Sequence, residues 1–323
     1  MAVHAEVRVH CERGDVVEAK SLLQLVDGIA EFDNDLTKAF AGLARARFMI
    51  HCGLFSGVSE MLDISDMVFA YVGFGLARME TADTRIALLG AMGRTREALD
   101  LALEWEPRLR AAGFGEPAMH PGLLDAIEAA SNHGDRHGFD LLTAKLNVDT
   151  AKDRPDLVAA RLWGRAQLAG SQQRTDEADE LFRELSLSWL KDGRPFWSAR
   201  AELAAGRVLR REGSRKRATA VFEIAYARFD ELGALAWRDV TEREIGRIGR
   251  KRATATAQLS ATAQLSATEL HVATSAAEGA SNKEIATQSF MSVKTVESHL
   301  TSAFRKLGIT RRSQLHQALE HHK

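Results

Sequence analysis

Short glycine-centred breaks recur along the first 250 residues at a nearly constant spacing. Between them Ala, Leu, Glu and Arg recur at intervals of three and four residues, which is the period of a helix. The gaps between breaks are 39, 40, 41 and 79 residues, close to multiples of 40, and a period of about 40 is that of stacked helix pairs. We therefore expect an all-α fold in which residues 1–249 form a helical repeat array. The breaks are centred on Gly14, Gly53, Gly93, Gly134 and Gly213, and Gln173 stands where the missing break would fall.

The last unit of this array has the spacing of a tetratricopeptide-type (TPR-like) repeat. Small residues at 206 and 218 would let its two helices approach closely, and Phe222 would fill the gap to the next pair. An irregular helical bundle is the alternative. The unit comprises Gly206 and Leu209 on the first helix, Gly213 at the turn, and Ala218, Phe222 and Ala225 on the second. Similar triplets are Ala19, Leu23 and Val26, and Ala178, Phe182 and Leu185.

The charge balance changes after residue 249. Residues 250–323 hold ten Lys and Arg against five Asp and Glu, whereas residues 1–249 carry a net charge of −6. The six residues 256–261 are repeated unchanged at 262–267, which lengthens a tether. We interpret residues 250–264 as a linker and residues 265–323 as a second domain. A basic module attached to an acidic body is typical of a nucleic-acid-binding unit joined to something else.

Several classes of function lack the residues that they need. No apolar stretch approaches the roughly 20 residues that cross a bilayer, and no secretory signal begins the chain, so we expect a cytoplasmic protein without a membrane partner. Cys11 and Cys52 lack the paired spacing of a zinc site, and the terminal histidines lack supporting ligands. No catalytic arrangement can be assigned from spacing. We expect no enzyme activity, no metal and no cofactor.

A short helix, a tight turn and a longer helix follow one another near the C-terminus. We expect a helix from about Ala267 to Glu278 that stops at Gly279. Next, Ser281 and Glu284 form a capping box that starts a short helix. This pattern predicts a helix-turn-helix whose second helix enters the major groove of DNA. The remaining boundaries are the end of the short helix near Phe290, the cap Ser292, the longer helix Val293 to Lys306, and its stop Gly308.

The longer helix divides into two faces. The apolar residues recur at near-helical spacing and should face the domain core. The polar face should meet DNA, with the positive end of the helix dipole toward phosphate. The core face comprises Val296, Leu300, Ala303, Phe304 and Leu307, and the polar face comprises Lys294, Thr295, Glu297, Ser298, Thr301 and Arg305.

Three segments, 281–286, 292–300 and 305–309, together resemble the LuxR-type helix-turn-helix of bacterial regulators. The resemblance implies a four-helix domain that binds double-stranded DNA as a homodimer, with a fourth helix from about Arg312 to Glu320 at the dimer contact. Leu315 and Leu319 are the candidate contact residues on that helix. By the same resemblance Glu297, Ser298 and Thr301 face base edges, while Lys283, Lys294, Thr295 and Arg305 lie near the DNA backbone.

The opening of this domain departs from the family pattern. Members usually begin with Leu, Thr or Ser, any residue, Arg and Glu, whereas residues 265–269 carry Thr268 in place of the arginine. Ala273 and Ser275 stand where larger apolar residues are common. Lost methylenes in a core cost on the order of 1 to several kcal/mol. The first helix is therefore expected to pack less firmly.

The array and this domain together are similar to the C-terminal half of the large ATP-binding LuxR-family regulators. The chain has no Gly-x-x-x-x-Gly-Lys-Ser/Thr loop to hold a triphosphate. It is either a shortened descendant or a chain whose start lies upstream. We hypothesise a DNA-binding transcription regulator controlled through the array, which would receive a protein or a small ligand. The alternative is an interaction adaptor that dimerises with a full-length relative and binds DNA poorly alone.

Overall fold

The computed structural model describes residues 2–30, 34–111, 121–144, 146, 155–248, 265, 267–289, 291, 293–307 and 309–320. Every regular element within these residues is a helix, so the expected all-α fold is confirmed. The helices are α1 (Ala2–Arg13), α2 (Val16–Ala30), α3 (Asp35–His51), α4 (Val58–Tyr71), α5 (Gly75–Ala91), α6 (Thr95–Ala111), α7 (Pro121–His133), α8 (Arg136–Ala144), α9 (Pro155–Ser171), α10 (Thr175–Lys191), α11 (Pro195–Glu212), α12 (Arg215–Glu231), α13 (Leu235–Arg247), α14 (Ala267–Ala277), α15 (Asn282–Gln288), α16 (Val293–Leu307) and α17 (Leu315–Glu320).

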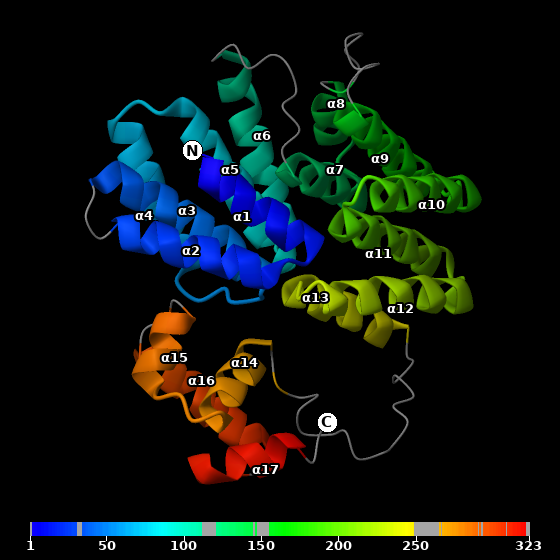
Figure 1. The fold of residues 1–323 in the computed structure, drawn as a ribbon. Helices are drawn as coiled ribbons and strands as arrows, with labels where there is room; N and C mark the ends of the chain where they lie inside the picture. Colours follow the sequence, from blue (N-terminus) through cyan, green and yellow to red (C-terminus); the bar gives the residue numbers. More distant parts are fainter. Residues whose placement is uncertain are drawn as a thin grey trace.

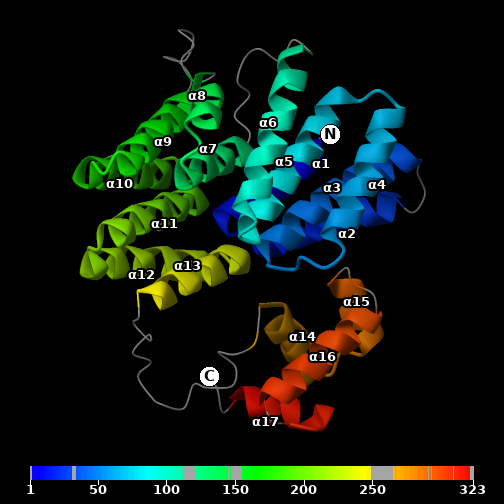
Figure 2. The same cartoon turned by 180° about the vertical axis from the view of Figure 1, so that it is seen from behind.

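Helices α1 to α13 stack into a curved array, and α14 to α17 lie beneath it (Figure 1). Figure 2 shows the same arrangement from behind. Consecutive helices pack against each other along the array. The two halves also meet, because α11 contacts α1, and α13 contacts α3 and α5. The array therefore closes on itself, and its inner helices share one core.

The breaks between helices lie where the sequence places them. All five predicted glycines have a positive φ, and so does Gln173 at φ 61°, the only such residue besides glycine in the described part of the chain. An L-residue in this conformation costs roughly 1–2 kcal/mol, which is why glycine stands at the other breaks. Gln173 closes its turn in the same way as they do, since the Arg174 N–H donates to Ala169 O at 2.9 Å.

The breaks are in fact twice as frequent as the sequence analysis proposed. Gly73, Gly193 and Gly233 also have positive φ and lie midway between predicted breaks. The turn residues from 173 to 233 therefore follow one another every 20 residues, after helices of 17 or 18 residues such as α10 and α11. The real unit of the array is one helix and one turn, and the 40-residue period is two such units.

The close helix contact predicted in the last unit is present. An added Cβ at Gly206 would lie 2.4 Å from Phe222 Cε1, so only glycine fits at this crossing of α11 and α12. Phe222, Ala218 and Ala225 are fully buried, as are the corresponding Ala178 and Leu185. The packing of these helix pairs is therefore as predicted, while the match to a tetratricopeptide-type repeat stays a prediction.

Aromatic side chains run through the second half of the array. The ring of Trp189 lies 6.0 Å from both Trp163 and Trp197, measured between ring centres, and Trp163 lies 5.5 Å from Phe182. All four side chains are almost completely buried. Ring pairs at these distances add about 0.5–1.5 kcal/mol beyond their area. These helices are therefore held by large, rigid contacts, as expected for tryptophans that anchor the repeats.

Candidate nucleic-acid interface

The turn before the short helix α15 is built by two predicted capping elements. Gly279 adopts φ 98° and ends α14. The Ser281 Oγ accepts from the Glu284 N–H at 3.2 Å, while the Ser281 N–H donates to Glu284 Oε2 at 2.7 Å. These hydrogen bonds lower the pKa of Glu284, which keeps the carboxylate charged beside the positive end of α15. The capping box is therefore confirmed and fixes where α15 begins.

The faces of α16 are arranged as predicted. Val296, Leu300 and Ala303 are buried, and Phe304 and Leu307 are partly buried against the same cluster. The cluster also contains Val272 and Ala273 of α14, Ile285 of α15 and Leu315 of α17. Small alanines occupy several of its positions, consistent with the expected loose first helix. Phe290, Ser292, Gly308 and the linker 250–264 lie outside the described residues, as do the last three residues.

Glu269 holds α16 in place, a role that the sequence analysis did not assign. Its carboxylate is buried and accepts hydrogen bonds from Ser302 Oγ at 2.5 Å and from Lys306 Nζ, both on α16. This residue is the glutamate of the family's opening pattern, so the signal was present. A charge-assisted pair between α14 and α16 fixes the angle at which α16 is presented.

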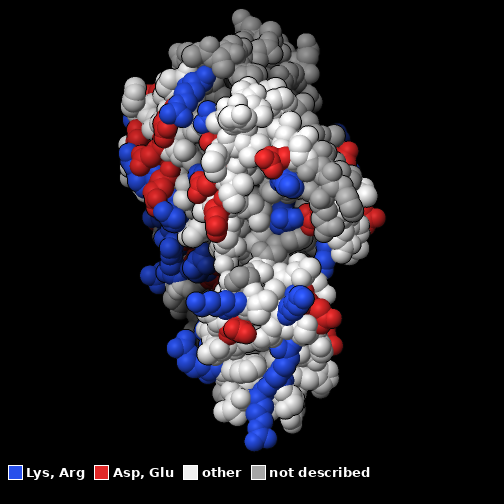
Figure 3. All heavy atoms as spheres, turned by 90° about the vertical axis from the view of Figure 1, so that its left-hand side faces the viewer, with Lys and Arg blue, Asp and Glu red and all other residues white. Residues whose placement is uncertain are grey.

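The predicted DNA-facing residues form an exposed surface on α15 and α16. Among the described residues, none of its three cations, Lys283, Lys294 and Arg305, forms an ion pair, so all three are available to phosphate. Figure 3 shows Lys and Arg side chains over the lower end of the molecule, where these helices lie. Thr295 alone is half-buried, whereas Lys283, Lys294, Glu297, Ser298, Thr301 and Arg305 are exposed.

Residues 263–319 match the family described as bacterial regulatory proteins, luxR family. These residues are a LuxR-type helix-turn-helix domain. The match covers the four helices α14 to α17 and begins two residues before the predicted start of the domain at residue 265.

Curated relatives match most of the chain. A protein of Mycobacterium bovis and one of Mycobacterium tuberculosis, each named "Putative HTH-type transcriptional regulator", are 28% identical to it over 342 aligned positions. The alignment covers 94% of this chain and 37% of each relative. The chain thus spans a little over a third of the length of the curated relatives that it matches. No solved structure matches it significantly. No described helix is long and apolar enough to cross a membrane.

The fourth helix of the LuxR-type domain corrects part of the expected dimer contact. Leu315 is fully buried in the core of its own domain, because it packs beneath α14 and α16. It is not available to a partner in this arrangement. Leu319 is partly buried against the same core. The helix also begins differently, since residues 312–314 form a 3₁₀ turn before α17.

The LuxR-type domain is docked on the array through residues near the DNA-facing surface. Thr268 Oγ1 donates to Gly53 O at 3.0 Å, and both residues are buried. Thr268 is the residue that replaces the family's arginine. Met291, between α15 and α16, packs against the core of the array as well as its own domain. The departure from the family pattern therefore lies at the contact between the two parts of the molecule.

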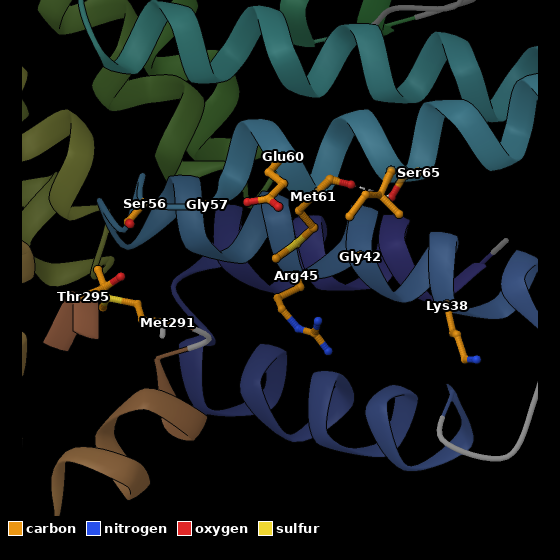
Figure 4. A pocket seen from close by; sticks show the side chains of 11 residues that line it. Lys38, Gly42, Arg45, Ser56, Gly57, Glu60, Met61, Ser65, Met291 and Thr295 are labelled. Carbon is orange, nitrogen blue, oxygen red and sulfur yellow. Dashed lines mark hydrogen bonds between the residues drawn. The ribbon is translucent and has the colours of Figure 1, made fainter. Parts of the chain in front are cut away.

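A cavity of about 540 Å³ separates α3 and α4 from the start of α16 (Figure 4). Thr295 and Met291 line it from the LuxR-type domain, and Lys38, Arg45 and Glu60 line it from the array. Figure 4 shows Thr295 and Met291 at the end of the cavity beside Ser56. Thr295, expected beside a DNA phosphate, thus faces the array instead.

Proposed function

We propose that this protein is a transcription regulator that binds DNA by placing α16 in the major groove. The observation that carries the proposal is the exposed polar face of α16 on a LuxR-type domain, with cations that no described carboxylate neutralises. Contacts to phosphate supply most of the affinity, and contacts to base edges supply the sequence preference. The phosphate contacts are Lys283, Lys294, Thr295 and Arg305, and the base contacts are Glu297, Ser298 and Thr301.

The three base-facing side chains offer different hydrogen bonds. Thr301 Oγ1 donates to Glu297 O at 2.8 Å, so its hydroxyl oxygen is left to accept from a base amino group. The Glu297 carboxylate also accepts, and a carboxylate in the major groove pairs best with the amino group of cytosine. Ser298 can donate or accept. This set favours bases that present amino groups toward the start of α16.

The proposed regulator binds as a homodimer on a two-fold-symmetric site. A dimer places two copies of α16 in successive major grooves, about one helical turn of DNA apart. The contact would use the outer side of α17, including Leu319, because Leu315 belongs to the core of its own domain. A symmetric pair of half-sites with this spacing is the expected recognition sequence.

Docking on the array is the proposed means of control. DNA at Thr295 would bring phosphate close to Glu60 and the turn before α4, which line the same cavity. Negative charge and occupied space both oppose that approach. The LuxR-type domain must then move away from α3 and α4 before α16 can enter a groove. A partner or ligand that shifts the array would therefore act on DNA binding through this contact.

DNA binding is tested by incubating the full chain with fragmented genomic DNA and sequencing what is retained. We expect enrichment of a short two-fold-symmetric sequence. Lys294→Ala should weaken binding to all sequences and reduce the salt slope by about 0.9, the contribution of one phosphate. The matched control is Lys216→Ala, an exposed lysine on α12. An unchanged slope in Lys294→Ala would refute its phosphate contact.

The base-facing residues require a different readout. Ser298→Ala or Thr301→Ala should change which bases are enriched while leaving the salt slope as it is. A uniform loss of affinity without a change in preference would place these side chains away from the bases. If the chain enriches no sequence yet pairs with a longer LuxR-family relative, it is the adaptor instead. The docked domain, with Thr295 turned toward the array, is the observation that favours this second candidate.

Control by docking is tested with Thr268→Val, which keeps the side-chain shape and removes its hydrogen bond to Gly53. A buried hydrogen bond contributes about 1 kcal/mol, so the undocked population and the DNA affinity should rise about fivefold. Thr287→Val is the control, because the Thr287 hydroxyl bonds only within α15, to Lys283 O at 3.0 Å. Equal DNA affinities for wild type and Thr268→Val would refute the inhibitory role of the contact.

A further inference from the structure

A second cavity, of about 310 Å³, lies inside the array between α5, α6 and α7 on one side and α11 and α13 on the other. We call it the arginine pocket, because six arginines line it against three carboxylates. Trp237 and Val240 add apolar surface. The arginines are Arg200, Arg207, Arg210, Arg211, Arg243 and Arg247, and the carboxylates are Asp125, Glu128 and Glu244.

The deepest arginine is fully occupied by its neighbours. Arg200 is 2% exposed and bonds Asp125 at 2.5 Å and Glu128 at 3.2 Å. Its guanidinium carbon lies 3.6 Å from the centre of the Trp237 ring. Burial raises the pKa of Asp125 to about 6, against the lowering effect of Arg200. This group of residues joins α7, α11 and α13 and is structural.

The outer arginines share too few carboxylates. Glu244 alone contacts three of them, with Arg207 Nε at 3.1 Å, Arg210 Nε at 3.1 Å and Arg247 at 2.9 Å. Arg210 Nε and Glu244 Oε2 do not form a hydrogen bond despite their distance, so the Arg210 donor stays unsatisfied although it is buried. One carboxylate therefore serves three guanidiniums.

Two further arginines have no carboxylate at all among the described residues. Arg211 donates only to Asn132 Oδ1, at 2.5 Å, and Arg243 forms no ion pair. Burial lowers the pKa of Arg211, and the nearby Arg210 and Arg207 lower it further, against the raising effect of Glu128. Like charges gathered in a partly enclosed site repel each other. The pocket thus carries an excess of three positive charges that the described residues do not neutralise.

We propose that the arginine pocket binds a small polyanion that carries two or more phosphate or carboxylate groups. Guanidinium groups bind both kinds of anion in bidentate geometry, and a volume of about 310 Å³ is at the small end of ligand sites. Arg210, Arg211 and Arg243 hold the anionic groups, and Trp237 covers the rest of the ligand. This supplies a ligand class for the proposed control through the array, although binding in the pocket does not require that the protein bind DNA.

Calorimetric titration of the full chain without DNA tests the proposal, with inorganic pyrophosphate as one probe and citrate as the other. We expect saturable binding of one molecule per chain for at least one probe. The double variant Arg211→Gln with Arg243→Gln should weaken it at least tenfold. Both side chains are exposed, so the fold should persist. Should the double variant unfold, Arg247→Gln, whose side chain is 60% exposed, gives the same test.

Two matched variants separate the pocket from other basic surfaces. Arg215→Gln removes an exposed arginine on α12 that does not line the pocket. Lys294→Ala removes a cation of the DNA-facing surface. Both should bind the probe as wild type does. Absence of saturable binding for both probes, equal weakening in Arg215→Gln, or loss in Lys294→Ala would each overturn the proposal. Failure of DNA binding alone would leave the pocket result intact.

Discussion

Gly206→Ala is expected to destabilise the array, although alanine is the better helix former. The new Cβ would lie 2.4 Å from Phe222 Cε1 and 2.5 Å from Cδ1. Carbon atoms in favourable contact are about 3.5 Å apart, so the ring must move by about 1 Å. Phe222 is fully buried and is rigid, and overpacking of this kind costs about 3 kcal/mol. Replacing glycine within a helix returns about 1 kcal/mol. The net loss is about 2 kcal/mol.

The assay is urea unfolding followed by circular dichroism, with Gly246→Ala as the matched control. Nothing lies within 4 Å of a Cβ at Gly246, so the same substitution there should stabilise by about 0.5–1 kcal/mol. The urea midpoint should therefore fall for Gly206→Ala and rise for Gly246→Ala. Adding Phe222→Leu to Gly206→Ala should lose less stability than the two single changes combined. A Gly206→Ala protein as stable as Gly246→Ala would refute the reasoning.

Two more predictions concern buried charge. Arg200→Ala leaves Asp125 and Glu128 facing each other without a cation, so we expect a loss of 3–5 kcal/mol in urea unfolding, and a loss below 1 kcal/mol would contradict it. Burial lowers the pKa of His51 to about 4 while its ring bonds Leu232 O at 3.0 Å, so the folded state holds it neutral. The unfolded state takes up a proton below about pH 6.5, and wild type should lose about 3 kcal/mol between pH 6.5 and 4 relative to His51→Gln. A stability difference that does not change with pH would exclude this origin.

The helical period and the glycine breaks were enough to predict the fold class and most turns of the array. Gln173 shows how far a period can reach, because its place in the series identified a turn that its residue type does not favour. The intermediate turns at Gly73, Gly193 and Gly233 were missed, since pairing helices in advance made them look like ordinary helix ends. The closure of α11 onto α1 was beyond prediction, because contacts between distant helices leave no local pattern.

For the DNA-binding domain, capping residues and helical faces sufficed for the internal structure. The capping box of Ser281 and Glu284 and the buried face of Val296 and Leu300 follow from local hydrogen bonding and spacing. The dimer assignment of Leu315 came from family resemblance alone and disregarded that a fourth helix must also cover its own core. The contact of Thr268 with Gly53 joins residues 215 positions apart. The sequence marked Thr268 as unusual without indicating what it touches.

The 20-residue spacing of the turns makes direction in this array a question of even and odd. Each turn reverses the chain, so gaining or losing one helix would send every later helix the opposite way. The chain leaving α13 would then depart from the other edge of the array, away from the Gly53 turn on which the LuxR-type domain sits. Only changes of two helices preserve that geometry. Length variation among such regulators should therefore come in steps of about 40 residues, because an odd step would separate sensor from DNA reader.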